Sequence, residues 1–312
     1  MKSGTTKVVV AALGANAAIA AIKFAVALLT LSAAMLAEAV HSLADTTNQV
    51  FLLVGLKRSE RPADDAHPFG YGLEQYFWSF VVALMLFFVG AVVSIYEGVE
   101  KILEPHPLER TYLIYAILGV SLVIEACSFS VAYREFKRKK PRGLSHFGAL
   151  RATKDASVAV VLLEDTAALC GLTIALVGVA LVELTGAPVF DGVSSICIGA
   201  LLAIVAFLLA RKTKGLLIGE AASAEDQDRI RGALAGIPGI GRVSRVATLQ
   251  LGASQILVGI EADFEDGLPA DEVERLILRM EDAIHDTVPS VRSCFIEPHD
   301  VPRRGRRKAK EG

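Results

Sequence analysis

The chain has 312 residues, of which 53% are hydrophobic and 21% are charged, and its formal net charge is −2. This near-neutral balance argues against a nucleic-acid partner, which selects strongly basic surfaces. The four cysteines are scattered without a Cys-x-x-Cys pair, so neither a disulfide framework nor a zinc knuckle is indicated.

Long apolar blocks dominate the first 210 residues and predict membrane-spanning helices. Each block has about 20 residues, the length that a helix needs to cross the hydrocarbon of a bilayer. The first block is too long for a signal peptide and lacks a convincing cleavage site, so we expect it to be retained as a span. The six predicted transmembrane helices are Val8–Leu29, Leu36–Leu56, Tyr76–Tyr96, Tyr112–Ala132, Val158–Val182 and Phe190–Ala210.

Basic residues in the connections between these spans predict the orientation. They gather between spans four and five (Lys137–Arg142), after span two (Lys57, Arg58) and after span six (Arg211–Lys214). By the positive-inside rule these segments are cytoplasmic, and an even number of spans then places both termini in the cytoplasm. We therefore expect an integral protein of a bacterial inner (cell) membrane.

After Lys214 the pattern becomes that of a small soluble domain. Helical spacing and strand-like alternation follow in the order α-β-β-α-β, which predicts a ferredoxin-like α+β fold. The predicted elements are a helix at Glu225–Ala235, strands at Arg242–Leu251 and Gln255–Phe264, a helix at Pro269–Val288 and a strand at Val291–Ile296. The expected organisation is a six-helix transmembrane domain at 1–214, the ferredoxin-like domain at 215–300 and a basic disordered tail at 301–312.

An ionisable pair inside the second predicted span indicates a metal ion. His41 and Asp45 are four residues apart and therefore lie on one helical face. An imidazole nitrogen and a carboxylate oxygen at this spacing can bind one divalent metal ion between them. A buried histidine can also hydrogen-bond a neighbouring helix, but the carboxylates elsewhere in the apolar spans favour ligation.

Span five supplies two further carboxylates, Glu164 and Asp165. Two adjacent acids in an apolar helix repel each other unless they are protonated, paired or bound to metal. They point about 100° apart, so one of them faces the site more directly. The alternative is that both are protonated and hydrogen-bonded between helices.

Further charges within the spans include Lys23, Glu125 and Asp191. Lys23 in span one and Glu125 in span four can neutralise each other or serve the function. Asp191, at the start of span six, is better placed to cap a helix or to pair at a helix interface.

Two motifs carry a resemblance to a known family. The segments His41–Asp45 (HSLAD) and His67–Gly72 (HPFGYG), together with six spans and a ferredoxin-like domain, resemble the cation diffusion facilitator family over about residues 8 to 300. The segment Leu162–Ala168 (LLEDTAA) resembles the zinc transporter 9-like branch of that family. The resemblance implies a homodimer that exchanges a divalent cation, usually zinc, for protons by alternating access. The metal is then the transported substrate, with no permanently bound cofactor.

The resemblance also implies a tetrahedral transport site with two ligands from span two and two from span five. His41 and Asp45 match the first pair, and Asp165 matches the second ligand of span five. The first ligand of span five is usually His or Asp, but this chain has Val161 there. Glu164, one position round the helix, or water can fill the gap.

The loop after span two contains Asp64 and His67, three residues apart. Such a pair can hold a metal ion, although Pro68 and the neighbouring glycines also suit an ordinary turn. The resemblance implies that Asp64 and His67 belong to a second metal site, in which Tyr71 replaces a usual histidine.

The function that we expect is therefore divalent metal efflux by proton-coupled antiport. Zinc is the preferred cargo, and replacing a nitrogen ligand by Glu keeps manganese, cobalt and iron(II) as alternatives. Two other readings stay open: a transport-impaired dimerising or metal-sensing partner, because of Val161, and an intramembrane metal hydrolase. The hydrolase reading is the weaker one, because Ser42 follows His41 where an HExxH enzyme carries its general base.

Overall fold

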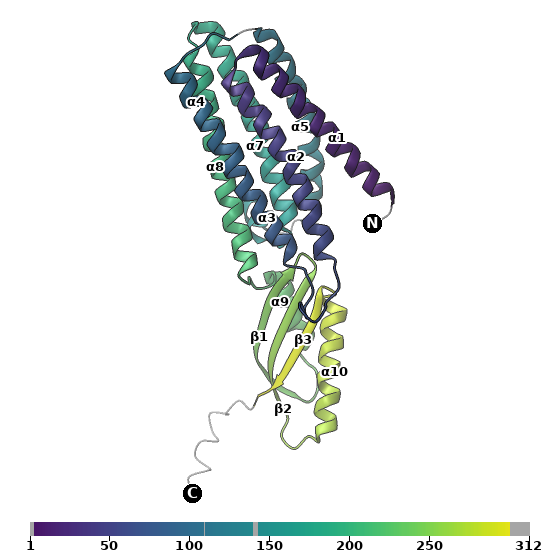
Figure 1. The fold of residues 1–312 in the computed structure, drawn as a ribbon. Helices are drawn as coiled ribbons and strands as arrows, with labels where there is room; N and C mark the ends of the chain where they lie inside the picture. The colour runs from purple at the N-terminus through teal and green to yellow at the C-terminus, as the bar shows by residue number, and fades with distance from the viewer. Residues whose placement is uncertain (1–2, 109, 140–142, 300–312) are drawn as a thin grey trace. The chain divides into compact units, whose positions relative to one another are not determined.

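The computed structural model describes residues 3–108, 110–139 and 143–299 and divides into two compact units (Figure 1). The helical unit contains residues 1–58, 74–151 and 155–214, and the C-terminal unit contains 59–73, 152–154 and 215–312. The predicted basic tail at 301–312 lies outside the described residues. The helices before Gly215 are α1 (Ser3–Thr30), α2 (Ala33–Ser59), α3 (Glu74–Met85), the π-helix η1 (Leu86–Val92), α4 (Val93–Leu103), α5 (Thr111–Lys139), α6 (His146–Ala152), α7 (Ala156–Thr185) and α8 (Val189–Leu217).

Each of the six predicted spans falls on a helix of this unit. Within the described residues, four helical stretches are long and apolar enough to cross a membrane: Glu74–Leu103, Thr111–Arg134, Ala156–Thr185 and Val189–Leu217. Within α1, the stretch Asn16–Thr30 is apolar but shorter. The hydropathy of α2 is lowered by the polar residues that make it a candidate for function.

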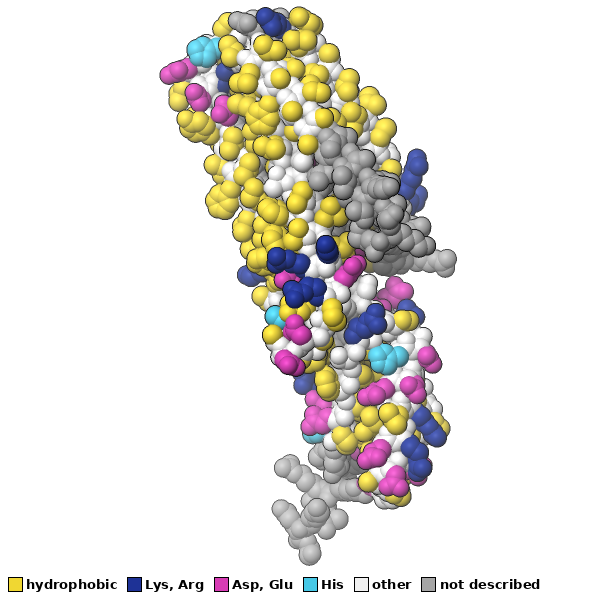
Figure 2. Space-filling view, turned by 45° about the vertical axis from the view of Figure 1, so that its right-hand side comes forward, with side chains coloured by type: hydrophobic (Ala, Val, Ile, Leu, Met, Phe, Trp, Pro, Cys, Tyr) yellow, Lys and Arg dark blue, Asp and Glu magenta, His cyan; other side chains and the backbone are white. Residues whose placement is uncertain are grey.

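The outer surface of the helical unit is apolar, as a lipid-facing surface requires. Figure 2 shows hydrophobic side chains spread over the helices, whereas acidic and basic side chains crowd the surface of the C-terminal unit. Large apolar side chains are more than half exposed on several helices, among them Leu28, Phe88, Val123 and Phe207. Their exposure would be costly in water but is favourable in a bilayer.

The interior of the helical unit is built from aliphatic side chains and close helix contacts. Leu86, Leu172 and Leu202 are completely or almost completely buried in one continuous cluster. Glycines allow α4 and α8 to approach closely: a Cβ on Gly98 would lie 2.6 Å from the carbonyl oxygen of Gly192. Small residues at helix interfaces are the usual way in which membrane helices pack.

The third predicted span differs from the expectation of one regular helix. It consists of α3, η1 and α4, so that seven residues from Leu86 to Val92 have π-helical hydrogen bonding in the middle of the span. The short helix α6 was also not predicted, because its seven residues lie in a basic connection without apolar periodicity.

The C-terminal unit has the predicted α-β-β-α-β order. It contains α9 (Ala224–Leu234), β1 (Ile240–Gly252), β2 (Gln255–Phe264), α10 (Ala270–Thr287) and β3 (Val291–Pro298). The sheet order is β1-β2-β3, with β1 antiparallel and β3 parallel to the central strand β2. This arrangement confirms the predicted fold class, a helical membrane protein with a small α+β domain after the helices.

The core of this domain follows from the alternation in β2 and the helical spacing in α10. Val258 and Ile260 on β2 and Met280 and Ile284 on α10 are buried together. At the start of α9, the Ser223 hydroxyl accepts a hydrogen bond of 3.1 Å from the backbone N–H of Asp226. This N-cap satisfies one of the free amides of the first turn.

Two short segments that precede Gly215 belong to the C-terminal unit. The loop 59–73 contacts the β1–β2 hairpin, where a Cβ on Gly252 would lie 3.1 Å from the Cα of Gly72. Lys154 forms an ion pair of 2.7 Å with Glu220. Both segments are therefore part of the same compact body as the ferredoxin-like domain.

Candidate metal-binding site on helix α2

Helix α2 carries the candidate site, and its first turn is fixed by a residue of α8. Asp191 accepts hydrogen bonds from the Ser32 hydroxyl (2.6 Å) and from the backbone N–H groups of Ala33 (2.6 Å) and Ala34 (3.2 Å). These are amides that have no partner within the helix itself. The prediction that Asp191 caps a helix is confirmed. Lys101 of α4 adds a hydrogen bond of 2.6 Å to the carbonyl oxygen of Leu31.

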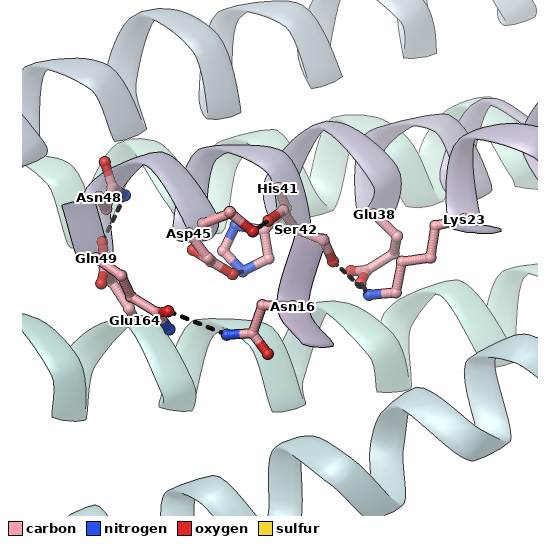
Figure 3. A network of polar contacts seen from close by, with 10 residues as sticks. Asn16, Lys23, Glu38, His41, Ser42, Asp45, Asn48, Gln49 and Glu164 are labelled. Atoms are coloured by element: carbon pink, nitrogen blue, oxygen red, sulfur yellow. Dashed lines mark hydrogen bonds and ion pairs between the residues drawn. The ribbon is translucent and has the colours of Figure 1, made fainter. Parts of the chain in front are cut away.

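His41 and Asp45 lie side by side on the inner face of α2 (Figure 3). Nε2 of His41 is 3.4 Å from Oδ2 of Asp45, and the His41 side chain is only 2% exposed. Among the described residues, neither ring nitrogen of His41 nor Oδ1 of Asp45 has a hydrogen-bond partner. Buried polar atoms are rarely left in this state, so they indicate a missing ligand at this face.

Asn48 extends this line by one more turn. It is fully buried, and its side-chain nitrogen donates a hydrogen bond of 2.7 Å to Oε1 of Glu164 on α7. Its side-chain oxygen also lacks a partner among the described residues. The spacing of residues 41, 45 and 48 places all three side chains on one face of α2, with Glu164 opposite.

The two acids of α7 have different surroundings. Glu164 is buried and held by Asn48, whereas Asp165 is partly exposed and accepts a hydrogen bond of 3.3 Å from Ser128 of α5. The charge of Asp45 acts on both of them. No three described His, Cys, Asp or Glu side chains come close enough together to hold a metal ion jointly. Val161 packs against the aliphatic core.

A buried ion pair lies one turn before His41. Nζ of Lys23 on α1 is 3.3 Å from Oε2 of Glu38 and donates a hydrogen bond of 2.8 Å to the Ser42 hydroxyl. The ion-pair partner of Lys23 is therefore Glu38, on the next helix, because α2 places Glu38 directly against α1. Among the described residues no direct ion pair joins Lys23 to Glu125, so the choice between neutralisation and a functional role for Glu125 stays open.

The loop residues Asp64 and His67 are exposed and form a turn in the C-terminal unit. The backbone N–H of His67 donates to Oδ1 of Asp64 (2.8 Å), and the Tyr71 hydroxyl donates to Oδ2 (2.7 Å). Nδ1 of His67 lies 3.5 Å from Oδ1. These hydrogen bonds lower the pKa of Asp64 below its usual range, the bond from Tyr71 having the largest effect. Both carboxylate oxygens therefore have local partners.

Two features of the site are missing from the sequence interpretation. The first is Asn48, although its spacing from His41 and Asp45 places it on the same helical face and could have indicated it as a site residue. The pairing of Lys23 with Glu38 needs the packing of α1 on α2, which no local pattern reveals.

Comparison with known proteins gives matches over most of the chain. The family model of the cation efflux transmembrane domain matches residues 9–218. The human protein named proton-coupled zinc antiporter SLC30A9, mitochondrial, is 36% identical over 264 residues, which are 84% of this chain and 46% of the relative. Metal tolerance protein C4 of Arabidopsis thaliana is 33% identical over 225 residues, 72% of this chain and 49% of the relative. The chain spans about half the length of these two curated relatives.

Proposed function

This chain belongs to the cation efflux (cation diffusion facilitator) family, and we propose that it exports a divalent metal cation across a membrane, with zinc as the preferred cargo. The family consists of transporters rather than enzymes, which excludes the metal hydrolase reading. The human relative is named as a zinc antiporter, which supports zinc as the cargo.

The observation that carries the proposal is the line of unsatisfied polar atoms on α2. Both ring nitrogens of His41, Oδ1 of Asp45 and the side-chain oxygen of Asn48 are buried without hydrogen-bond partners among the described residues. A desolvated divalent cation would bind one ring nitrogen of His41 together with the two oxygens, because nitrogen and oxygen donors of this kind are its usual ligands. We assign His41 and Asp45 to the transport site, with Asp165 and Glu164 as the donors from α7.

The finer features of the proposal rest on the chemistry of these donors. Carboxylates and imidazole bind metal only in their deprotonated forms, so metal and protons compete for the same site. This competition supports proton-coupled antiport, and we propose that it proceeds by alternating access in a homodimer. The basic segments favour an orientation with both termini in the cytoplasm, and we propose a bacterial inner membrane as the location. A second site at Asp64 and His67 stays a prediction.

The test is metal uptake into proteoliposomes that contain a metal-sensitive dye. We expect Asp45→Ala and Asp165→Ala to abolish uptake driven by a proton gradient, and His41→Ala to change the preference among zinc, manganese, cobalt and iron(II). Thr47→Ala is the matched control, because the Thr47 hydroxyl is exposed and bonds only the carbonyl oxygen of Leu43 in its own helix. Uptake by Asp45→Ala at the wild-type rate would contradict the proposal. Absence of uptake in the wild type, with metal binding intact, would favour the transport-impaired partner.

A further inference from the structure

A lysine buried beside a cation site needs a physical reason, because its positive charge repels the cargo. Lys23 is 1% exposed, and its partner Glu38 is completely buried. A buried ion pair is weak evidence for stability, since the cost of desolvating both charges offsets most of their attraction. The pair is therefore better explained by what it does to the neighbouring site.

Glu38 has the position of a metal ligand but is prevented from acting as one. Residues 38, 41 and 45 follow one another at spacings of three and four, so all three side chains share one face of α2 (Figure 3). One carboxylate oxygen of Glu38 is 3.3 Å from Nζ of Lys23, and the other has no hydrogen-bond partner among the described residues. Without Lys23, Glu38 would present a complete carboxylate next to His41.

The surroundings keep Glu38 in this arrangement. Lys23 is anchored by its second hydrogen bond, to the Ser42 hydroxyl. On the other side, Gly171 of α7 leaves room for Glu38: a Cβ there would lie 2.6 Å from Oε1. The charge of Lys23 also acts on His41 and Asp45, which shows that the ion pair and the candidate site share one electrostatic environment.

We infer that Lys23 is a positioning residue that withholds Glu38 from the cation site and thereby sets a low affinity for the cargo. This inference rests on the proposed function, because it concerns the same site. A transporter must release its ion at the far side of the membrane, and an additional carboxylate in contact with the ion would slow that release. At the effective dielectric of a protein interior, one elementary charge within roughly 10 Å of a divalent ion changes its dissociation constant by at least about tenfold.

The test is Zn²⁺ binding to the purified full-length protein, measured by isothermal titration calorimetry. We expect Lys23→Met to bind Zn²⁺ at least about tenfold more tightly than the wild type, because Glu38 is released. Glu38→Gln should bind at least about tenfold more weakly, because the charge of Lys23 is then uncompensated. The double variant Lys23→Met/Glu38→Gln should lie close to the wild type, and Lys23→Arg, which keeps the charge, should do the same.

The opposite signs separate this inference from a purely structural role of the pair. If the pair only holds α1 against α2, both single variants weaken binding in parallel with a loss of thermal stability, and the inference is overturned. If Lys23→Met does not fold, the comparison of Glu38→Gln with the double variant decides. Equal Zn²⁺ affinity of these two variants also overturns the inference. A wild type that binds and transports no divalent cation would overturn the proposed function as well, whereas wild-type binding with the wrong order of affinities overturns this inference alone.

Discussion

The polar residues of α2 divide into two groups according to their partners. Glu38 and Ser42 are bonded to Lys23, and Gln49 accepts a hydrogen bond of 3.2 Å from Asn16. These contacts attach α2 to α1. His41 and Asp45 contact each other and have no hydrogen bond to α1; buried atoms of both lack partners among the described residues, as does the second oxygen of Glu38. His41 and Asp45 are therefore available to a ligand.

Asn48→Leu tests whether Asn48 holds the acid of α7. The substitution keeps the branched shape and the number of side-chain heavy atoms but removes the hydrogen bond of 2.7 Å to buried Glu164. We expect the free energy of unfolding to fall by about 1–3 kcal/mol, because a buried carboxyl group loses its donor. The measurement is thermal or denaturant unfolding in detergent. Thr47→Ala, on the same helix, should stay within about 0.5 kcal/mol of the wild type. Equal stability of the two variants would contradict this role.

Tyr71→Phe tests the origin of the low pKa of Asp64. The hydrogen bond from Tyr71 is the largest cause of the shift, so its removal should raise the pKa of Asp64 towards the ordinary value. A depressed pKa in the folded state stabilises the fold above the unfolded pKa, and this contribution is lost as the pH falls through the folded pKa. In the variant this contribution should therefore be smaller, and its loss should be complete at a higher pH. Carboxyl-carbon NMR titration measures the shift, with the exposed Tyr96→Phe as control; an unchanged pKa would refute the assignment.

At the scale of elements, glycines bring α4 and α8 into close contact. Gly98 of α4 faces Gly192 and Ile196 of α8, and a Cβ on Gly199 of α8 would lie 2.8 Å from the carbonyl oxygen of Ala91. The Ser195 hydroxyl donates a hydrogen bond of 2.7 Å to the carbonyl oxygen of Ser94. The backbone of α8 is thus in direct contact with that of η1 and α4 over about two turns.

Gly98→Ala should disturb this contact strongly. The new methyl group would overlap the backbone of α8, and overpacking of this kind costs about 1–3 kcal/mol. Gly119→Ala on α5 is the matched control, because no described atom outside its own helix lies within 4 Å of the added Cβ. It should be neutral or stabilising by about 0.5–1 kcal/mol, since Ala is the better helix former. Thermal unfolding of both variants in detergent gives the comparison; a Gly98→Ala protein as stable as Gly119→Ala would show that the helices are not in contact.

Most of the helices and strands could be predicted because a local sequence pattern marks them. Long apolar blocks marked the spans, and alternation on both sides of Gly252-Ala253-Ser254 marked β1 and β2. The π-helix at Leu86–Val92 could not be predicted, because a change in hydrogen-bonding register leaves no trace in an apolar sequence. His41 and Asp45 follow from spacing on one helix, but the contact of Asn48 with Glu164 depends on how α2 packs against α7.

At the scale of the whole molecule, each unit consists of segments that are not continuous in the sequence. The loop 59–73 and residues 152–154 belong to the C-terminal unit, although helices of the other unit flank them in sequence. Gly72 meets Gly252, about 180 residues further along the chain, so no local pattern could have indicated the contact. The polypeptide therefore passes between the two units several times.

Gly72→Ala tests the attachment of this loop. An added Cβ would overlap the carbonyl oxygen of Leu251 and the side chain of Gln255. We expect the loop to leave the hairpin, so that endoproteinase Asp-N cuts before Asp64 and Asp65 faster than in the wild type. Gly259→Ala on β2, where no described atom lies within 4 Å of the added Cβ, should leave the cleavage rate unchanged. Equal cleavage rates in the two variants would show that the contact does not restrain the loop.

The capping of α2 by Asp191 has a consequence for biogenesis. The backbone N–H of Ala33 finds its acceptor 158 residues later in the chain, on the last of the membrane helices. At ribosomal speeds this distance takes on the order of ten to thirty seconds to synthesise. During that time the Ser32 hydroxyl can accept a hydrogen bond from the N–H of Met35, but the amides of Ala33 and Ala34 lack the acceptor that Asp191 later supplies. Helix α2, which we assign to ion binding, is thus among the first helices to be synthesised, but its hydrogen bonds to Asp191 are among the last to form.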